Sequence, residues 1–295
     1  MVVSFAFEGS EALTTAQLQA VLIHHQLPAR QPYRQQLRDL CEQLGVSLTE
    51  IVEQSPLLAE HVTITDGVWL VGRYWLKSGA DAFFQWRSGR DSFVSALRRF
   101  VVEAFKSILN LVLITPEARL SAYRACLVEG ILVQKHMAAW QCGLRDDCEW
   151  LLVFEDDALI QAETKSRLQL LFETELRHWN SAQWIYCDLA GGYDPNQALP
   201  VKSCWDPLLE RWCLSHIRTN TICSYLVSRQ VLTGLLSVVE RYPWLRQLPA
   251  DHLINFASLI AVDAHSLPRC FHWREPFFRH GSFHAALAST VSGIR

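Results

Sequence analysis

Residues 149–160 read EWLLVFEDDALI, an apolar run that ends in three consecutive carboxylates. The segment Trp150–Phe154 holds only aromatic, Leu and Val side chains, which is typical of a strand buried on both faces of a sheet. Glu155, Asp156 and Asp157 follow at once. Like charges this close raise one another's pKa and cost free energy unless a positive group lies among them. The stretch therefore predicts a buried strand whose end requires a cation.

Further apolar segments alternate with helical patterns. The stretch QWIYCDLAG at 183–191 predicts a second strand that ends in an acid, Asp188. The stretch at 221–242 passes from a strand into a helix, and ADHLINFASLI at 250–260 predicts a further helix. We therefore expect an α/β fold with a single Rossmann-like mixed sheet flanked by helices. Ligands of such sheets bind beyond the carboxyl ends of the strands, where both acidic segments lie.

The first part of the chain is harder to assign. Residues 13–30 fit either a helix or a short strand at 20–24 followed by a loop with two prolines. The stretch YRQQLRDLCEQLG at 33–45 predicts a helix that its final glycine ends. Residues 60–76 are rich in β-branched and aromatic side chains and favour strands, whereas 80–115 predicts a helical insertion.

Composition narrows the class of protein. The chain has 295 residues, of which 50% are hydrophobic and 19% charged, as in a folded globular protein, and we expect one domain. With 27 basic and 30 acidic residues, it lacks the charge of a general nucleic-acid binder. The nine cysteines are scattered without zinc-site spacing, and the first residues do not resemble a signal peptide. We expect reduced thiols and a cytoplasmic location, with contact at the inner face of the membrane left open.

The carboxylate triplet suggests a divalent cation. Hard cations such as Mg²⁺ and Mn²⁺ select carboxylate oxygens, use one or two protein carboxylates, and complete their shell with water and phosphates. A site at Asp157, assisted by Asp156, therefore fits a nucleotide diphosphate ligand. The alternative is that both acids favour the positive end of the following helix, which is worth only ~0.3–1 kcal/mol each.

The chain resembles a known family around this triplet. The stretch EGILVQKHMAAWQCGLRDDCEWLLVFEDDALI at 129–160 is similar to the segment of family 25 glycosyltransferases, the lipopolysaccharide-type galactosyltransferases, that ends in Glu-Asp-Asp. The matching positions are Glu129, Gly130, His136, Trp140, Glu155, Asp156 and Asp157. TNTICSYLVSRQ at 219–230, LPADHLINF at 248–256 and PFFRHGSF at 276–283 resemble later segments of that family. The similarity covers residues 119–284.

The resemblance implies a GT-A type fold and a metal-dependent hexosyltransferase of lipopolysaccharide biosynthesis. The donor would be a nucleotide diphosphate sugar, UDP-galactose or UDP-glucose, and the acceptor a glycan or glycolipid. A bound Mn²⁺ or Mg²⁺ would bridge the donor diphosphate and Asp157, with His280 completing the metal shell. Glu155 and Asp156 would assist or bind the ribose. The loop RQPYR at 30–34 would stand in for a nucleotide-binding loop through Arg30 and Arg34.

The C-terminal stretch at 265–284 independently suggests an anion site. It concentrates seven basic side chains against a single acid, Glu275: His265, Arg269, His272, Arg274, Arg279, His280 and His284. Such a patch suits a diphosphate through charge-assisted hydrogen bonds, with Arg279 a candidate donor ligand. The alternative is a solvated basic loop.

Transfer with inversion also requires a base for the acceptor hydroxyl. Asp251 matches the family segment, although it could simply cap its helix, and Asp188 is the rival base. Glu129 and His136 share a helical face and either point at the donor or pack in the core. Several tryptophans could stack on a sugar ring, and the sequence does not choose among them: Trp179, Trp184, Trp205, Trp212 and Trp273.

Two other functions remain open. A metal-dependent phosphohydrolase or nuclease also uses acidic clusters, but two-metal sites usually draw acids from several strand ends, and this sequence has one dense triplet. A non-catalytic scaffold that binds nucleotide sugars or glycans is the second alternative. The joint presence of the triplet, Asp251 and His280 favours an enzyme.

Overall fold

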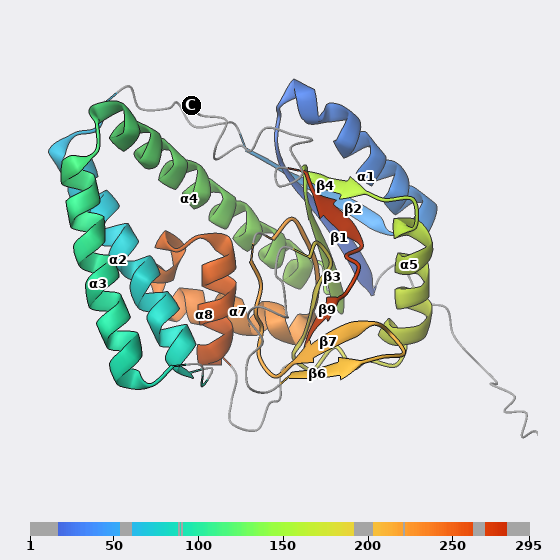
Figure 1. The fold of residues 1–295 in the computed structure, drawn as a ribbon. Helices are drawn as coiled ribbons and strands as arrows, with labels where there is room; N and C mark the ends of the chain where they lie inside the picture. The colour runs from blue at the N-terminus through green and yellow to red at the C-terminus, as the bar shows by residue number, and fades with distance from the viewer. Residues whose placement is uncertain are drawn as a thin grey trace, which may run out of the picture.

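The computed structural model describes residues 17–53, 61–87, 89, 91–191, 203–220, 222–261 and 269–281. Its centre is an eight-stranded sheet with the strand order β2-β1-β3-β8-β5-β9-β7-β6 (Figure 1). The strands are β1 (Leu18–His25), β2 (Ser47–Glu53), β3 (Trp150–Glu155), β5 (Ile185–Asp188), β6 (Ser203–Asp206), β7 (Arg211–Leu214), β8 (Ser224–Ser228) and β9 (Arg269–Trp273). The sheet mixes parallel and antiparallel pairs and is flanked by helices, which confirms the α/β class.

The directions of the strands bring the ends of several strands together near the acidic triplet. β1 runs parallel to both β2 and β3, while β8 is antiparallel to β3 and to β5. The carboxyl ends of β1 and β3 therefore meet the beginning of β8 at the same edge. Just beyond β3, the short strand β4 (Ala158–Ile160) pairs antiparallel with β10 (Phe278–His280), so that His280 lies opposite Ala158.

The sheet separates two hydrophobic clusters because successive side chains of a strand point to opposite faces. In β3, Leu151 and Val153 belong to one cluster, whereas Trp150, Leu152 and Phe154 belong to the other. This two-sided burial explains why β3 is a continuous apolar run.

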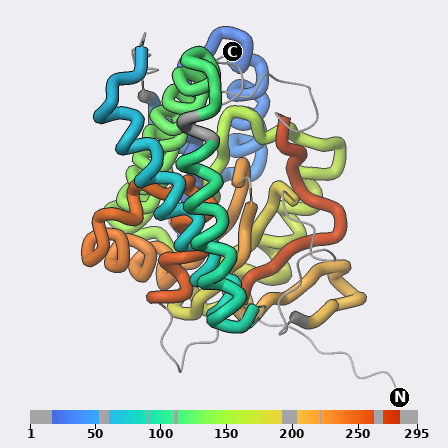
Figure 2. The backbone as a smooth tube through the Cα atoms, turned by 60° about the vertical axis from the view of Figure 1, so that its left-hand side comes forward, coloured from blue at the N-terminus to red at the C-terminus, as the bar shows by residue number. Residues whose placement is uncertain are grey.

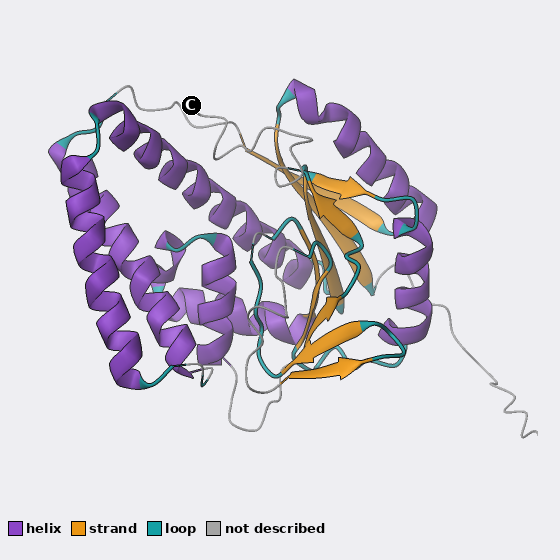
Figure 3. Cartoon of the chain, in the orientation of Figure 1, coloured by secondary structure: helices purple, strands orange, loops and turns teal. Residues whose placement is uncertain are grey.

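Helices cover both faces (Figure 3). Side chains of α4 (Pro116–Arg145), α7 (Arg229–Arg241) and α8 (Ala250–Ala261) contribute to the first cluster, with the short helix η3 (Pro243–Gln247) between α7 and α8. Side chains of α1 (Gln31–Leu44), α5 (Thr164–Leu171) and the π-helical turn η2 (Phe172–Leu176) contribute to the second. The short helix η1 (Pro28–Arg30) precedes α1. None of the helices in the described ranges has the length and hydropathy needed to cross a bilayer.

Two further helices, α2 (Ile64–Arg87) and α3 (Phe93–Leu113), form a hairpin at the outside of the molecule (Figures 1 and 2). The prediction of strands over 60–76 is wrong, because α2 begins at Ile64 and the helical region starts before residue 80. Leu70, Ala80 and Phe84 are buried at helical spacing along α2. Their packing outweighs the β-propensity of the neighbouring aromatic and β-branched residues.

Of the two alternatives left open for the first part of the chain, the structure has the strand: residues 18–25 form β1, with all eight side chains buried. The helix predicted at 33–45 is α1, which ends at Gly45 in the left-handed conformation, with φ of 66°. All nine cysteines are free thiols.

Candidate active site

A pocket of about 440 Å³ lies at the carboxyl ends of β1 and β3, within the usual size range of small-molecule sites. α2, α4 and the beginning of α8 contribute further walls. Its ionisable lining residues are His24, His25, Arg30, Lys77, Glu129, Lys135, Glu155, Asp156, Asp157, Asp251, His252 and His280. Residues from distant parts of the chain thus meet at the sheet edge where α/β folds bind ligands.

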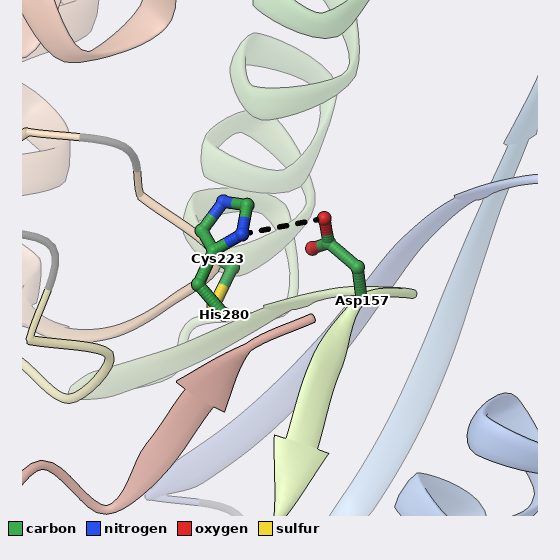
Figure 4. Close-up of side chains that lie close together, drawn as sticks. All are labelled: Asp157, Cys223 and His280. Carbon is green, nitrogen blue, oxygen red and sulfur yellow. Dashed lines mark ion pairs between the residues drawn. The ribbon is translucent and has the colours of Figure 1, made fainter. Parts of the chain in front are cut away.

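Asp157 and His280 come together through the pairing of β4 with β10. The Nδ1 atom of His280 lies 3.6 Å from Oδ2 of Asp157, and the backbone N–H of Gly281 donates to the carbonyl of Asp157 at 2.8 Å. Cys223, just before β8, completes a group whose potential ligand atoms lie within 4.8 Å of one another (Figure 4).

The chemistry of this donor set fits a cation held by oxygen and nitrogen. A carboxylate and an imidazole are ligands that Mn²⁺ accepts, with water and phosphate oxygens in the remaining positions. Burial raises the pKa of Cys223 well above its ordinary value, and the negative charges of Asp157 and Glu155 raise it further. The thiol is therefore protonated when no metal is bound, and Asp157 and His280 are the members of this group that suit a hard cation.

Asp156 does not belong to this group and is paired with arginines. Arg30 donates a short hydrogen bond from Nη1 to Oδ1 of Asp156, and Nη1 of Arg34 lies 3.8 Å from Oδ2. Arg34 also donates to the carbonyls of His25, at 3.3 Å, and Leu27, at 3.0 Å. Burial raises the pKa of Asp156, while the charge of Arg30 opposes that rise. Arg30 and Arg34 therefore supply part of the positive charge that the triplet requires. Of these two arginines, only Arg30 lines the pocket.

Glu155 is held by a chain of hydrogen bonds from the core. The indole N–H of Trp140 donates to the hydroxyl oxygen of Tyr225 at 2.9 Å. Because Trp can only donate, the Tyr225 hydroxyl is free to donate to Nδ1 of His136, 2.9 Å away. The other ring nitrogen of His136 then donates to Glu155 at 3.2 Å. Burial lowers the pKa of His136 to about 3, so the ring is neutral and this tautomer satisfies every partner.

The three neighbouring carboxyl groups at the end of β3 nevertheless disfavour one another's negative charge. Burial raises the pKa of Glu155 well above its ordinary value, and Asp157 and Asp156 raise it further. The positive charges of Arg30 and of Lys135, whose Nζ atom donates to the carbonyl of His24 at 2.7 Å, oppose this rise only in part. A divalent cation beside Asp157 would reverse the electrostatic penalty on these carboxylates.

The two candidate bases have different surroundings. Asp251 is half-buried in the first turn of α8, lines the pocket, and accepts a hydrogen bond from the backbone N–H of His252 at 2.8 Å. Asp188 is fully buried and is not among the pocket residues. It accepts hydrogen bonds from the Thr219 hydroxyl at 2.8 Å and from two backbone N–H groups at 3.1 Å. Asp188 is therefore held in the core by hydrogen bonds, whereas Asp251 lies in the wall of the pocket.

The basic C-terminal stretch does not act as one patch. His280 lines the pocket, whereas Arg279 is exposed, is not among the pocket residues, and precedes His280 in β10, so that the two side chains point to opposite faces. Arg274 is exposed and lies 3.6 Å from Glu210, while His272 is buried beside Asp188. His265 and His284 lie outside the described residues.

The remaining candidates divide between site and core. Glu129 lines the pocket and forms an ion pair of 3.0 Å with Arg73 of α2, whereas His136 acts only through Glu155. None of the tryptophans proposed for sugar stacking lines this pocket: Trp179, Trp184, Trp205, Trp212 and Trp273. The sequence patterns did not indicate Lys77 or Lys135, because Lys77 directly follows the stretch predicted as strands and Lys135 lies in an ordinary helical pattern.

Comparison of the chain with protein-family models gives no match. Comparison with curated proteins likewise finds no significant relative.

Proposed function

We propose that this protein is a metal-dependent glycosyltransferase that moves a hexose from a nucleotide diphosphate sugar to a glycan or glycolipid acceptor. The convergence of Asp157, His280 and Asp251 on one pocket is the observation that carries the proposal. These three residues belong to segments that resemble family 25 glycosyltransferases, which suggests a UDP-hexose donor. We include in the proposal that the chain is related to this family.

Asp157 and His280 are the residues that would hold Mn²⁺ or Mg²⁺. Such a metal would supply positive charge that stabilises the diphosphate leaving group. Arg30 and Lys77 add positive charge to the pocket wall, with Arg30 held in place by Asp156. These groups suit a ligand with two phosphates better than a neutral sugar alone.

Asp251 is the base in this proposal. Its carboxylate takes the proton from the acceptor hydroxyl as that oxygen attacks the anomeric carbon, which favours an inverting reaction. Glu155 orients a hydroxyl of the donor, because the Trp140–Tyr225–His136 chain holds its carboxylate in one position. Asp157 and Asp251 line the same pocket, as this division of labour requires.

A thermal-shift panel of nucleotide diphosphate sugars, with and without Mn²⁺, tests the proposal. We expect a UDP-hexose to raise the melting temperature only with Mn²⁺, since a ligand that binds the folded state stabilises it by mass action. The stabilising donor is then incubated with candidate acceptors, and release of the nucleoside diphosphate is measured. Cleavage of simple phosphate esters would instead indicate a phosphohydrolase, and Mn²⁺-dependent donor binding with no turnover would indicate a scaffold.

A further inference from the structure

Helix α3 presents an apolar face to solvent. It packs principally against α2, and the hairpin of these two helices stands at the outside of the molecule, away from the sheet (Figure 1). Leu97 is 49% exposed and Phe105 is 60% exposed, and the same face holds other large apolar side chains. These are Val94, Val101, Val102, Ile108 and Leu109.

The exposed apolar residues of α3 form a continuous stripe. Val94, Leu97, Val101, Phe105 and Ile108 follow one another at intervals of three or four, which places them on one side of a helix. A helix of 21 residues is about 30 Å long, so the stripe extends over most of that length. Isolated exposed apolar residues need no explanation, but a stripe of this extent indicates a docking surface.

The charge around the stripe favours an anionic partner. The sequence of α3 contains three basic residues and one acidic residue, a net charge of +2 in a chain whose total is -3. The basic residues Arg98, Arg99 and Lys106 are all exposed. Arg99 is paired with Asp91 at 2.7 Å, and Lys106 with Glu103 at 2.7 Å.

The position of Arg98 favours a lipid surface over a second copy of the chain as the partner of α3. It lies within the apolar stripe, one helical turn from both Val94 and Val102. Glu103 is the single acid in the sequence of α3 and already pairs with Lys106, so a second α3 would offer Arg98 no unpaired carboxylate. At a bilayer surface, by contrast, an arginine extends from an apolar face to reach lipid phosphates.

We propose that the outer face of α3 binds in the plane of an anionic lipid bilayer, with its apolar stripe in the interface and its arginines on lipid phosphates. The proposal does not depend on the reaction catalysed in the pocket. Amphipathic helices with basic and bulky apolar residues bind anionic membranes in this manner.

Cosedimentation with vesicles tests this surface. We expect the full chain to sediment with mixed phosphatidylcholine–phosphatidylglycerol vesicles, much less with phosphatidylcholine alone, and less in high salt. The double variant Leu97→Gln/Phe105→Gln should lower the bound fraction at least about tenfold, since it removes two apolar contacts without changing charge. Arg98→Gln should weaken the salt dependence.

A matched control variant tests whether vesicle binding requires the apolar face of α3 or any exposed apolar side chain. Leu170 of α5 and Leu208 beside β6 are 57% and 91% exposed and belong to other parts of the fold, so Leu170→Gln/Leu208→Gln should bind vesicles like the parent. Circular dichroism and melting temperature verify that each variant is folded. The proposal is overturned if the parent stays in the supernatant, or if the α3 variant binds as well as the control. It is equally overturned if the parent is a dimer that the α3 variant converts to a monomer.

Discussion

The imidazole of His280 lies 3.6 Å from the carboxylate of Asp157, although Asp157 follows the central strand β3 and His280 ends β10, more than a hundred residues later. The antiparallel pairing of β4 with β10 produces this contact, because it sets His280 opposite Ala158. The acidic end of β3 thus gains a potential nitrogen ligand from a segment far away in the chain, a contact that local sequence patterns do not predict.

Asp157→Asn tests the metal site. We expect Mn²⁺ affinity, measured by isothermal titration calorimetry, to fall by about 10²-fold or more, because even outer-shell changes cost ~10–100-fold. Without metal, the free energy of unfolding should stay constant or rise, since one of three neighbouring negative charges is removed. Asp39→Asn, on the exposed surface of α1, is the control. Equal Mn²⁺ affinity in the two variants would refute the assignment.

Asp251→Asn tests the base. We expect donor binding and stability close to those of the parent, and transfer slower by ~10²–10⁴, the usual contribution of a general base. The rate should be measured at saturating donor, so that a change in donor affinity does not contribute. A variant that transfers at the parent rate would exclude Asp251 from the reaction.

Asp188→Ala should act on stability. The substitution removes the acceptor of the Thr219 hydroxyl and of the Ala190 and Gly191 N–H groups, at a cost of ~1–3 kcal/mol for each group left unsatisfied. Urea denaturation should therefore show a loss of several kcal/mol, on the order of 3. Asp188→Asn, whose side chain can still accept and donate, is the milder comparison. A stable but inactive Asp188→Ala protein would return Asp188 to the list of candidate bases.

Tyr225→Phe should disturb the network that holds Glu155. It leaves Nδ1 of His136 and the indole N–H of Trp140 without their partner in the core, so we expect a loss of ~1–3 kcal/mol in urea denaturation. The double variant Tyr225→Phe/Trp140→Phe should lose less than the sum of the single changes, since one hydroxyl serves both. Strict additivity would show that the chain of hydrogen bonds is not energetically coupled.

Acid should weaken the fold through His25. Burial, together with the positive charges of Lys135 and Arg30, lowers the pKa of His25 from its ordinary value of 6.5 to about 4. The unfolded chain therefore takes up this proton first, so the contribution of His25 is complete above pH 6.5 and is lost as pH falls toward 4. We expect a loss of about 1–3 kcal/mol, allowing for water in the pocket.

Denaturation midpoints across this pH range, compared between the parent and His25→Gln, measure that effect. The variant should show a flatter pH dependence. His178→Gln, which changes an exposed histidine, should keep the slope of the parent. Identical slopes for all three proteins would mean that His25 does not titrate as its surroundings indicate.

Local sequence predicted much of the sheet centre. β3, β5 and β8 are apolar runs buried on both sides, and α1 ends at a glycine, so composition and spacing were sufficient there. The short strands β7, β9 and β10 escaped prediction because they pair with strands far away in the chain, and β6 escaped because it has only 4 residues. The beginning of α2 was mistaken for strands because its aromatic and β-branched residues favour strands until packing selects the helix.

By itself the sequence determined that an apolar strand ends in three acids and that such a cluster needs positive charge, because burial and like-charge repulsion follow from composition alone. Only the tertiary structure decided how that charge is supplied: Arg30 and Arg34 pair with Asp156, while Asp157 faces His280. It also separated Asp251 at the pocket from Asp188 in the core. The physical reason is that side-chain partners across a sheet edge are set by strand pairing over long sequence distances, which no local pattern encodes.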